Sequence, residues 1–250
     1  MSQGQKAARF AELHVKGTPL ALYNVWDAGS AKAVEKAGAP AIATSSWAVA
    51  EAQGYRDGED IPFTLARQIV ERITATVDVP VTADFEGGYT DDDAALADNV
   101  SRLIDTGIVG INFEDREVKG AGLYDPERQA TRISAMRKAA DKAGVALFIN
   151  ARTDLFLGQG NEPSATVDEA VHRSKAYADA GASGFFIPGL QEEALIARIC
   201  EESVLPVNVM VMDGVPDNER LAQIGVARIS FGATPYVVAM NGVQEHAARL

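Results

Sequence analysis

Two carboxylates stand two residues apart at the end of a short β-branched segment. Residues Val79 to Tyr89 read Val-Pro-Val-Thr-Ala-Asp-Phe-Glu-Gly-Gly-Tyr, so Asp84 and Glu86 precede a Gly-Gly break. Alternate residues of a strand point to the same side, so both acids leave one side if the strand continues through Glu86. Oxygen ligands and water suit a hard divalent cation such as Mg2+. The segment predicts a cation site, with a solvated loop or a helix cap as the simpler alternative.

Polar residues also follow the other expected strands, where each strand ends. They are Asn24 and Asp27, Thr44 to Trp47, Glu114 and Asp115, Asn150, Arg152 to Asp154, Asn208, Ser230 and Gly232. The acids can hold a cation, the guanidinium of Arg152 can bind a pair of anionic oxygens, and neutral donors can orient the rest. A site that combines a metal with a carboxylate ligand is therefore expected. The simpler interpretation of Arg152 is a surface ion pair with Asp154.

Strands and helices are expected to alternate along the whole chain. The expected strands are 20–25, 41–45, 79–85, 110–114, 146–151, 184–188, 206–210 and 227–231. The expected helices are 6–15, 28–37, 64–76, 91–106, 126–143, 166–180, 192–202, 216–224 and 236–249. This order predicts a parallel sheet. The leading architecture is a single (β/α)8 TIM barrel domain over residues 1–250, with a leading N-terminal helix, and an open doubly wound sheet is the alternative.

Composition narrows the class of protein. The chain has 250 residues, 47% of them hydrophobic, and a formal net charge of −12. That charge argues against nucleic acid or an anionic membrane as the main partner. No apolar run approaches the roughly 20 residues that span a bilayer, and the first residues lack an apolar signal-peptide core. Cys200 is the single cysteine, so no intrachain disulfide forms and a cytoplasmic protein is expected.

Five segments together resemble the isocitrate lyase / phosphoenolpyruvate mutase superfamily, in that family's order. They are Ser45-Ser46-Trp47, Gly54-Tyr55-Arg56-Asp57-Gly58, Ala83 to Tyr89, Phe113-Glu114-Asp115 and Asn150-Ala151-Arg152-Thr153-Asp154. The resemblance implies a barrel that binds Mg2+, with Mn2+ as a possible substitute, and an α-keto acid or its enolate. It also implies a homodimer or homotetramer, in which the C-terminal helix is exchanged between subunits.

The resemblance also implies roles for individual residues. Asp84 would be the direct metal ligand, and Asp57, Glu86 and Glu114 would hold the waters of the metal. The predicted substrate-binding residues are Ser45, Ser46, Trp47, Asp84, Arg152, Asn208 and Tyr23. The predicted catalytic residues are Lys119, Arg152 and Asp57.

Residues Arg116 to Asp125 lie where the family has its active-site lid. Isocitrate and methylisocitrate lyases carry a catalytic cysteine there, and this chain has none. Lys119 is the obvious lid residue that could meet a developing anion, although an isolated lysine is more often just solvated. The Gly-Ala-Gly that follows it lacks the polar groups of the phosphonate-handling members. The lid is most similar to that of the oxaloacetate-decarboxylase-like branch.

These residues predict a carbon–carbon lyase that acts on a small α-keto or α-hydroxy dicarboxylate through an enolate. A metal chelated by the keto and carboxylate oxygens would act as a Lewis acid when a bond at C3 breaks. Oxaloacetate-like decarboxylation is the leading example. Carbon–phosphorus chemistry on phosphonopyruvate, by a mutase or a hydrolase, is one alternative. An α-keto-acid-binding protein with little turnover is the other.

Overall fold

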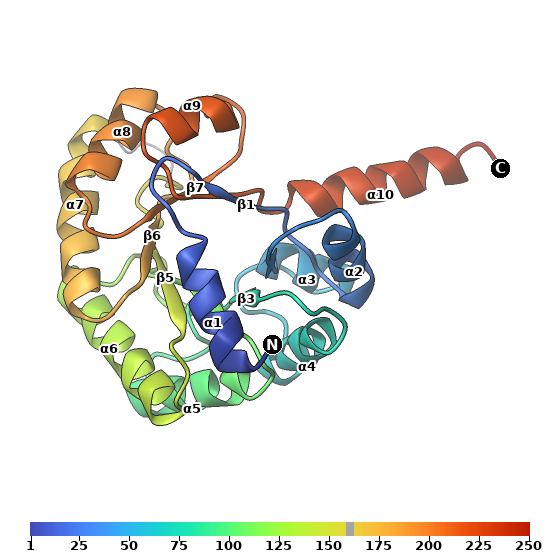
Figure 1. The fold of residues 1–250 in the computed structure, drawn as a ribbon, viewed down its shortest axis with the longest axis horizontal. Helices are drawn as coiled ribbons and strands as arrows, with labels where there is room; N and C mark the ends of the chain where they lie inside the picture. The colour runs from blue at the N-terminus through green and yellow to red at the C-terminus, as the bar shows by residue number, and fades with distance from the viewer. Residues whose placement is uncertain (159–162) are drawn as a thin grey trace.

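Eight parallel strands surround the centre of the molecule, in a computed structural model that describes residues 1–158 and 163–250 (Figure 1). They are β1 (Leu20–Leu22), β2 (Ile42–Ala43), β3 (Val81–Asp84), β4 (Gly110–Glu114), β5 (Phe148–Arg152), β6 (Gly184–Phe186), β7 (Val207–Met210) and β8 (Arg228–Ser230). The strand order β1-β8-β7-β6-β5-β4-β3-β2 brings the first two strands together, and a parallel bridge between Val25 and Thr44 joins them just beyond their ends. The sheet is therefore a nearly closed barrel, which confirms the expected (β/α)8 fold.

Helices surround the barrel and connect its strands. They are α1 (Gln3–Glu12), α2 (Ala28–Lys36), α3 (Ser46–Ala52), α4 (Phe63–Thr74), α5 (Asp93–Ile104), α6 (Pro126–Lys142), α7 (Pro163–Asp179), α8 (Glu193–Glu202), α9 (Asn218–Gln223) and α10 (Thr234–Ala247). Aspartates at positions 27, 92, 125 and 217 cap four of them by accepting a hydrogen bond from a backbone N–H of the first turn. The acidic run Asp91 to Asp93 thus leads into α5, with Asp92 as its cap, where a helix was expected to begin.

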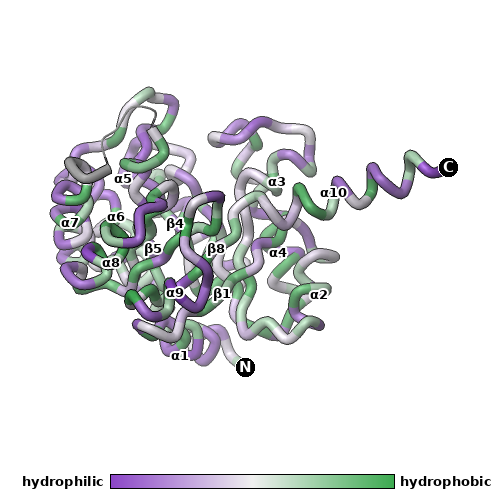
Figure 2. Tube along the Cα trace, turned by 90° about the horizontal axis from the view of Figure 1, so that it is seen from above, coloured by the Kyte–Doolittle hydropathy of each residue, from purple (hydrophilic) through white to green (hydrophobic). Residues whose placement is uncertain are grey.

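Helix α1 covers the end of the barrel where the strands begin (Figures 1 and 2). Phe10 is fully buried, and its ring meets that of Phe148 edge to face at 5.5 Å. The ring of His14, just after the helix, stacks on Phe148 with centroids 3.9 Å apart. This helix therefore closes the end of the barrel where the strands begin, and a cavity is to be sought at the opposite end.

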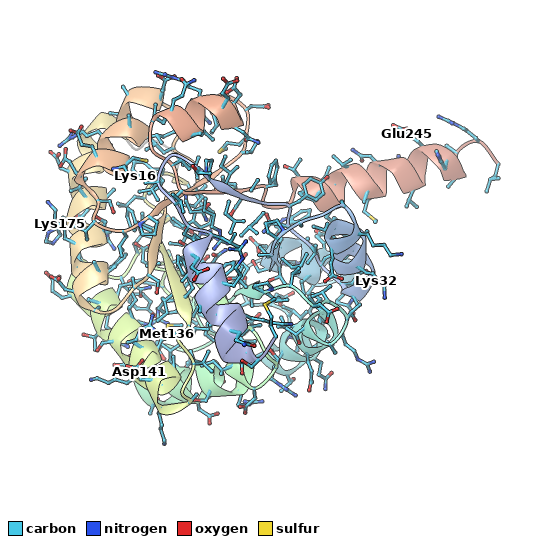
Figure 3. All side chains as sticks on the ribbon, viewed as in Figure 1. Lys16, Lys32, Met136, Asp141, Lys175 and Glu245 are labelled. Carbon is cyan, nitrogen blue, oxygen red and sulfur yellow. The ribbon has the colours of Figure 1, made fainter. Side chains whose placement is uncertain are left out.

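Helix α10 projects from the barrel instead of packing along it (Figure 1). Glu245, near its end, lies far from the strands (Figure 3). Four of its apolar side chains are exposed, namely Val237, Val238, Met240 and Val243. Among the described residues, no helix combines the length and the apolar character needed to cross a membrane.

Two expectations about local structure were wrong. The third strand ends at Asp84, because Glu86 has a φ of 51°, in the left-handed region, and the chain turns there. Helix α3 was not expected. It begins directly after Ser45, whose side chain accepts a hydrogen bond from Ala48 N and caps it. The other strands and helices occur as expected, with ends that differ by a few residues.

Candidate active site

A cavity of about 200 Å3 opens at the end of the barrel where the strands finish. Its lining residues come from all eight strands or from the loops and helices that follow them, namely Asn24, Ser45, Ser46, Trp47, Asp57, Asp84, Asn112, Arg152, Phe186, Met210, Ser230, Gly232 and Ala233. Asp84 and Arg152 lie at the ends of β3 and β5, Asp57 lies in the loop after α3, and Phe186 and Met210 lie at the ends of β6 and β7. The cavity contains most of the predicted site residues.

Asp84 has one carboxylate oxygen held and one free. Its Oδ2 accepts hydrogen bonds from Ser46 N at 3.1 Å and from Ser46 Oγ at 2.8 Å. Its Oδ1 is buried and has no hydrogen-bond partner in the described parts of the chain. An unpaired buried carboxylate oxygen is costly, so this atom is the best candidate for a direct bond to a cation.

Both carboxylate oxygens of Glu86 are already engaged in hydrogen bonds. Its Oε1 accepts hydrogen bonds from Gly58 N and Glu59 N at 3.1 and 2.9 Å, and its Oε2 accepts one from the Tyr89 hydroxyl at 3.1 Å. Burial, and then the charge of Asp84, raise the pKa of Glu86 to about 7. Asp84 and Glu86 therefore do not present two oxygens from one strand face, and Glu86 could reach a cation only through water.

Glu59 is a residue that the sequence reasoning missed. Its Oε1 accepts a hydrogen bond from Tyr89 N at 2.7 Å, while its own N–H holds Glu86. Glu59 and Tyr89 both have positive φ values, 63° and 64°, which are strained for residues other than glycine. Hydrogen bonds between the Glu59 loop and the Glu86–Tyr89 loop hold these conformations. Only the acidic type of Glu59, next to Asp57, could have indicated it.

Arg152 and Glu114 form a buried ion pair at the ends of neighbouring strands. The distance from Arg152 Nη1 to Glu114 Oε2 is 3.0 Å, and Arg152 Nε and Nη2 donate to the two oxygens of Asp154 at 2.5 and 3.0 Å. Burial lowers the pKa of Arg152, but the two carboxylates outweigh it and raise the pKa. Burial raises the pKa of Glu114, and Arg152 opposes that shift.

The pair with Asp154, expected as an alternative for Arg152, is therefore real, but it lies in the cavity wall and not on the surface. A guanidinium has five N–H donors, and these contacts use three of them. One donor on each terminal nitrogen remains, which is the arrangement that a ligand carboxylate needs.

The four predicted metal residues lie near one another without forming a closed ligand set. No group of three or more acidic, histidine or cysteine side chains among the described residues is arranged to hold a metal. Burial and the charge of Asp84 nevertheless raise the pKa values of both Asp57 and Glu86. The residues fit a cation bound directly by Asp84 Oδ1 and otherwise through water, because such a charge would relieve the repulsion among these carboxylates.

The segment expected to be the lid borders a second cavity beside the first. Lys119 and Arg116 line this cavity of about 180 Å3, together with Glu114 and Asp57, and Asp57 also lines the main cavity. The segment is tied back at its far end, where Tyr124 N donates to Asp115 O at 2.8 Å. Lys119 is exposed and does not line the main cavity, so a part in the chemistry would require this segment to move.

Two predicted substrate-binding residues do not reach the cavity. Tyr23 is 43% exposed and its ring packs against Phe231, because the strand alternates and turns the neighbouring Asn24 inward instead. Asn208 is buried below the cavity, where it shares a hydrogen bond of 3.2 Å with Ser230. In this structure neither side chain lines the cavity, so their roles in substrate binding stay predictions.

Several lining residues were not predicted to bind substrate. Asn24 and Ser230 were visible as polar strand ends, and Asn112 occupies an inward position of β4. Phe186 and Met210 gave no sequence signal, because apolar residues near strand ends are ordinary in a barrel core.

A family model described as phosphoenolpyruvate phosphomutase matches residues 10–250. An uncharacterized protein of Mycobacterium tuberculosis is 33% identical over 96% of this chain and 87% of its own length. A 2-methylisocitrate lyase of Escherichia coli is 25% identical over 98% and 84%, and an oxaloacetate decarboxylase of Pseudomonas entomophila is 27% identical over 70% and 60%.

Among solved structures, a putative phosphonomutase from Burkholderia cenocepacia superposes with a TM-score of 0.96 at 44% identity, covering 99% of both chains. At the level of the family, these comparisons confirm the expected enzyme class, carbon–carbon lyases and related mutases.

Proposed function

We propose that this chain, which belongs to the phosphoenolpyruvate phosphomutase family, is a Mg2+-dependent carbon–carbon lyase. Its substrate would be a small α-keto or α-hydroxy dicarboxylate, with oxaloacetate-like decarboxylation as the leading example. The observation that carries the proposal is the unpaired Oδ1 of Asp84 in the same cavity as the two free N–H donors of Arg152. One suits a cation and the other suits a carboxylate.

Asp84 would hold the cation, and Asp57, Glu86 and Glu114 would hold its waters. The cation would supply Lewis acidity that stabilises the negative charge of an enolate. Mg2+ suits this all-oxygen set of ligands, and Mn2+ can replace it.

The protein groups position the substrate for cleavage at C3. Arg152 would bind the C1 carboxylate through its two free donors, while Glu114 and Asp154 keep the guanidinium in place. Ser46 fixes the orientation of Asp84, because it donates both N–H and Oγ to Oδ2 and leaves Oδ1 toward the cavity. Breakage of the bond from C3 leaves its electron pair as an enolate, which takes up a proton, and Lys119 is the candidate donor once the lid segment covers the cavity.

The opposite wall of the cavity favours a leaving group that departs without charge. Phe186, Met210 and Ala233 lie there, and Arg152 is the only cationic residue among the described residues that line the cavity. Carbon dioxide is neutral, so its release needs no cationic partner on this wall. The size of the cavity, about 200 Å3, also suits a small dicarboxylate better than a tricarboxylate.

Carbon–phosphorus chemistry on phosphonopyruvate is the second candidate, supported by the similarity to the Burkholderia cenocepacia structure, a putative phosphonomutase. A phosphonate carries up to two negative charges and is usually met by arginine or lysine. The wall that contains Phe186 and Met210 offers none, so we place this candidate second.

The assay is pyruvate release from a panel of C4 to C7 keto and hydroxy acids with Mg2+, corrected for the metal-catalysed reaction without protein. Phosphate and phosphoenolpyruvate are measured in parallel with phosphonopyruvate. Release of pyruvate from one dicarboxylate supports the proposal, and phosphate or phosphoenolpyruvate formation supports the second candidate. Tight Mg2+-dependent binding of a keto diacid with no product would favour a binding protein.

We also propose that a second copy of the chain covers helix α10, giving a homodimer or a dimer of dimers. The helix leaves Val238 and Val243 57% and 62% exposed, and a projecting helix with apolar side chains gains stability when it is covered. Light scattering on the native protein should give at least twice the mass of one chain. The double variant Val238→Asp and Val243→Asp should lower that mass, whereas a monomeric wild type would refute the proposal.

A further inference from the structure

Polar side chains occupy the interior of this barrel at the floor of the cavity and directly below it. They come from β4, β5, β7 and β8 and are at most 4% exposed, namely Asn112, Asn150, Asn208, Arg228 and Ser230. Barrel interiors are ordinarily filled by branched apolar residues. A polar layer of this kind needs a physical reason, because buried polar groups are costly unless they are paired.

Arg228 is the most costly member of the layer. The residue is 0% exposed, and its Nη2 donates to Asn112 Oδ1 at 3.1 Å. Its Nε and Nη1 have no hydrogen-bond partner among the described residues, and none of the ion pairs found there involves it. Burial lowers the pKa of Arg228 to about 9, a shift that Asp84 opposes, so the side chain still carries its charge at pH 7.

Asn112 connects this buried cation to the cavity. Asn112 lines the cavity floor and is the register partner of Asp84 on the neighbouring strand. Its Oδ1 accepts both the Arg228 hydrogen bond and one from Asn150 Nδ2 at 2.9 Å. Its Nδ2 makes no hydrogen bond with any residue that the structure describes, so the amide N–H groups are free to serve a ligand.

The chemistry of the two side chains decides which way this amide faces. Two asparagines that contact each other could exchange donor and acceptor, because an amide offers both. A guanidinium can only donate, so Arg228 requires the oxygen of Asn112 on its own side. The nitrogen of Asn112 must then face away from Arg228.

We propose that Arg228 is a positioning residue that locks the Asn112 amide with its donors toward the cavity and holds a fixed positive charge beneath Asp84. The inference rests on the proposed function, because it concerns the cation and the keto-acid anion of that same site. The amide donors and the positive charge act in the same direction. They weaken the binding of a divalent cation alone in the cavity and strengthen the binding of an anion. The charge weakens the first ligand and strengthens the second.

The test measures the two binding steps separately in the full chain. Mn2+ binding is followed by the electron paramagnetic resonance signal of the free ion, and oxalate binding to the Mn2+-loaded protein is followed by calorimetry. Oxalate is used because its two planar carboxylates resemble the enolate of pyruvate. In Arg228→Met we expect Mn2+ to bind roughly tenfold tighter and oxalate roughly tenfold weaker. Arg228→Lys keeps a charged group that can only donate, so both affinities should stay near wild type.

Two controls separate this role from a structural one. Arg137, on α6 outside the barrel, donates to Leu147 O and Gly181 O, so Arg137→Met should change stability and leave both affinities unchanged. Asn112→Ala keeps the cation but removes the donor, so it should weaken oxalate and leave Mn2+ within about twofold. This variant also carries the test if Arg228→Met does not fold, although replacing an incompletely paired buried charge by an apolar side chain is often tolerated.

Opposite shifts of the two affinities in Arg228→Met support the inference. Shifts in the same direction, or no shift, would overturn it, and so would unchanged oxalate affinity in Asn112→Ala. A wild-type protein that bound neither Mn2+ nor oxalate would instead overturn the proposed function, and the inference with it.

Discussion

Replacing Asp84 by asparagine should make the metal-free protein more stable while abolishing its response to metal. The carboxylate of Asp84 has a buried oxygen without a partner, and its charge raises the pKa values of Asp57 and Glu86. An asparagine has the same shape and no charge. Its amide oxygen can still accept the two hydrogen bonds from Ser46, and its nitrogen would face the neighbouring carboxylates as a donor.

The size of the effect follows from three contributions. An unsatisfied buried polar group costs about 1–3 kcal/mol, and this cost disappears. The repulsion among the neighbouring carboxylates also decreases, while the hydrogen bonds from Ser46 weaken by about 1 kcal/mol because the acceptor is no longer charged. The net gain is about 2 kcal/mol in the free energy of unfolding. For a domain of this size, that is a rise in melting temperature of roughly 4–8 °C.

The assay is thermal unfolding at pH 8, above the raised pKa of Glu86, first with EDTA and then with an excess of Mg2+. Asp84→Asn should melt above wild type in EDTA and show no further rise with Mg2+, whereas wild type should rise because Mg2+ binds only the folded state. Asp93→Asn is the matched control, because Asp93 pairs with Arg128 at 2.7 Å on the surface, and its loss should lower stability slightly. A less stable Asp84→Asn in EDTA, or an undiminished response to Mg2+, would refute the reasoning.

Three further predictions concern the lid, the half-buried His14 and the Glu86 loop. Lys119→Ala should lower kcat more than it changes KM in steady-state assays with the best substrate, and an equal loss in binding would contradict a part in proton transfer. Burial and the charge of Arg228 lower the pKa of His14 to about 3, so protons bind the unfolded chain first as pH falls below about 6.5. Wild type should therefore lose about 2 kcal/mol from this residue between pH 8 and pH 5 in urea unfolding, and His14→Gln should lack that slope. Tyr89→Phe removes the hydroxyl that donates to Glu86 Oε2 and should lower the free energy of unfolding by about 1 kcal/mol at pH 8 in EDTA, where an unchanged value would speak against this contact.

The barrel was predictable because strands and helices alternate with clear signals along the chain. Apolar strands such as Gly110 to Glu114 are followed by polar strand ends, and glycines such as Gly38 and Gly181 end helices with positive φ values. Helix α3 was missed because only Thr44 and Ser45 separate it from β2, and Ser45, expected as the last residue of a strand, caps the helix instead.

Parts of the site depend on contacts between segments that are distant in the sequence, and local sequence patterns do not show which segments meet. Glu86 adopts a left-handed conformation because Gly58 N and Glu59 N hold its carboxylate from another loop. Tyr23 points outward because successive residues of an extended segment face opposite sides, and here Asn24 takes the inward position. A shift of one residue in this alternation exchanges the inward and outward side chains. The polar layer around Arg228 did leave a signal, because Asn112, Asn150 and Asn208 alternate with apolar residues on their strands. That pattern indicates inward-facing polar groups only when the closure of the barrel is known.

The most direct test of the proposed site is a crystal structure with Mn2+ and oxalate, in which anomalous scattering locates the metal. We predict one strong peak in the cavity, about 2 Å from Asp84 Oδ1, with Glu86 and Glu114 reaching it through water. Oxalate should contact the metal and the terminal nitrogens of Arg152. A metal bound elsewhere, or oxalate that leaves both Asp84 and Arg152 uncontacted, would contradict a metal-dependent keto-acid site at this end of the barrel.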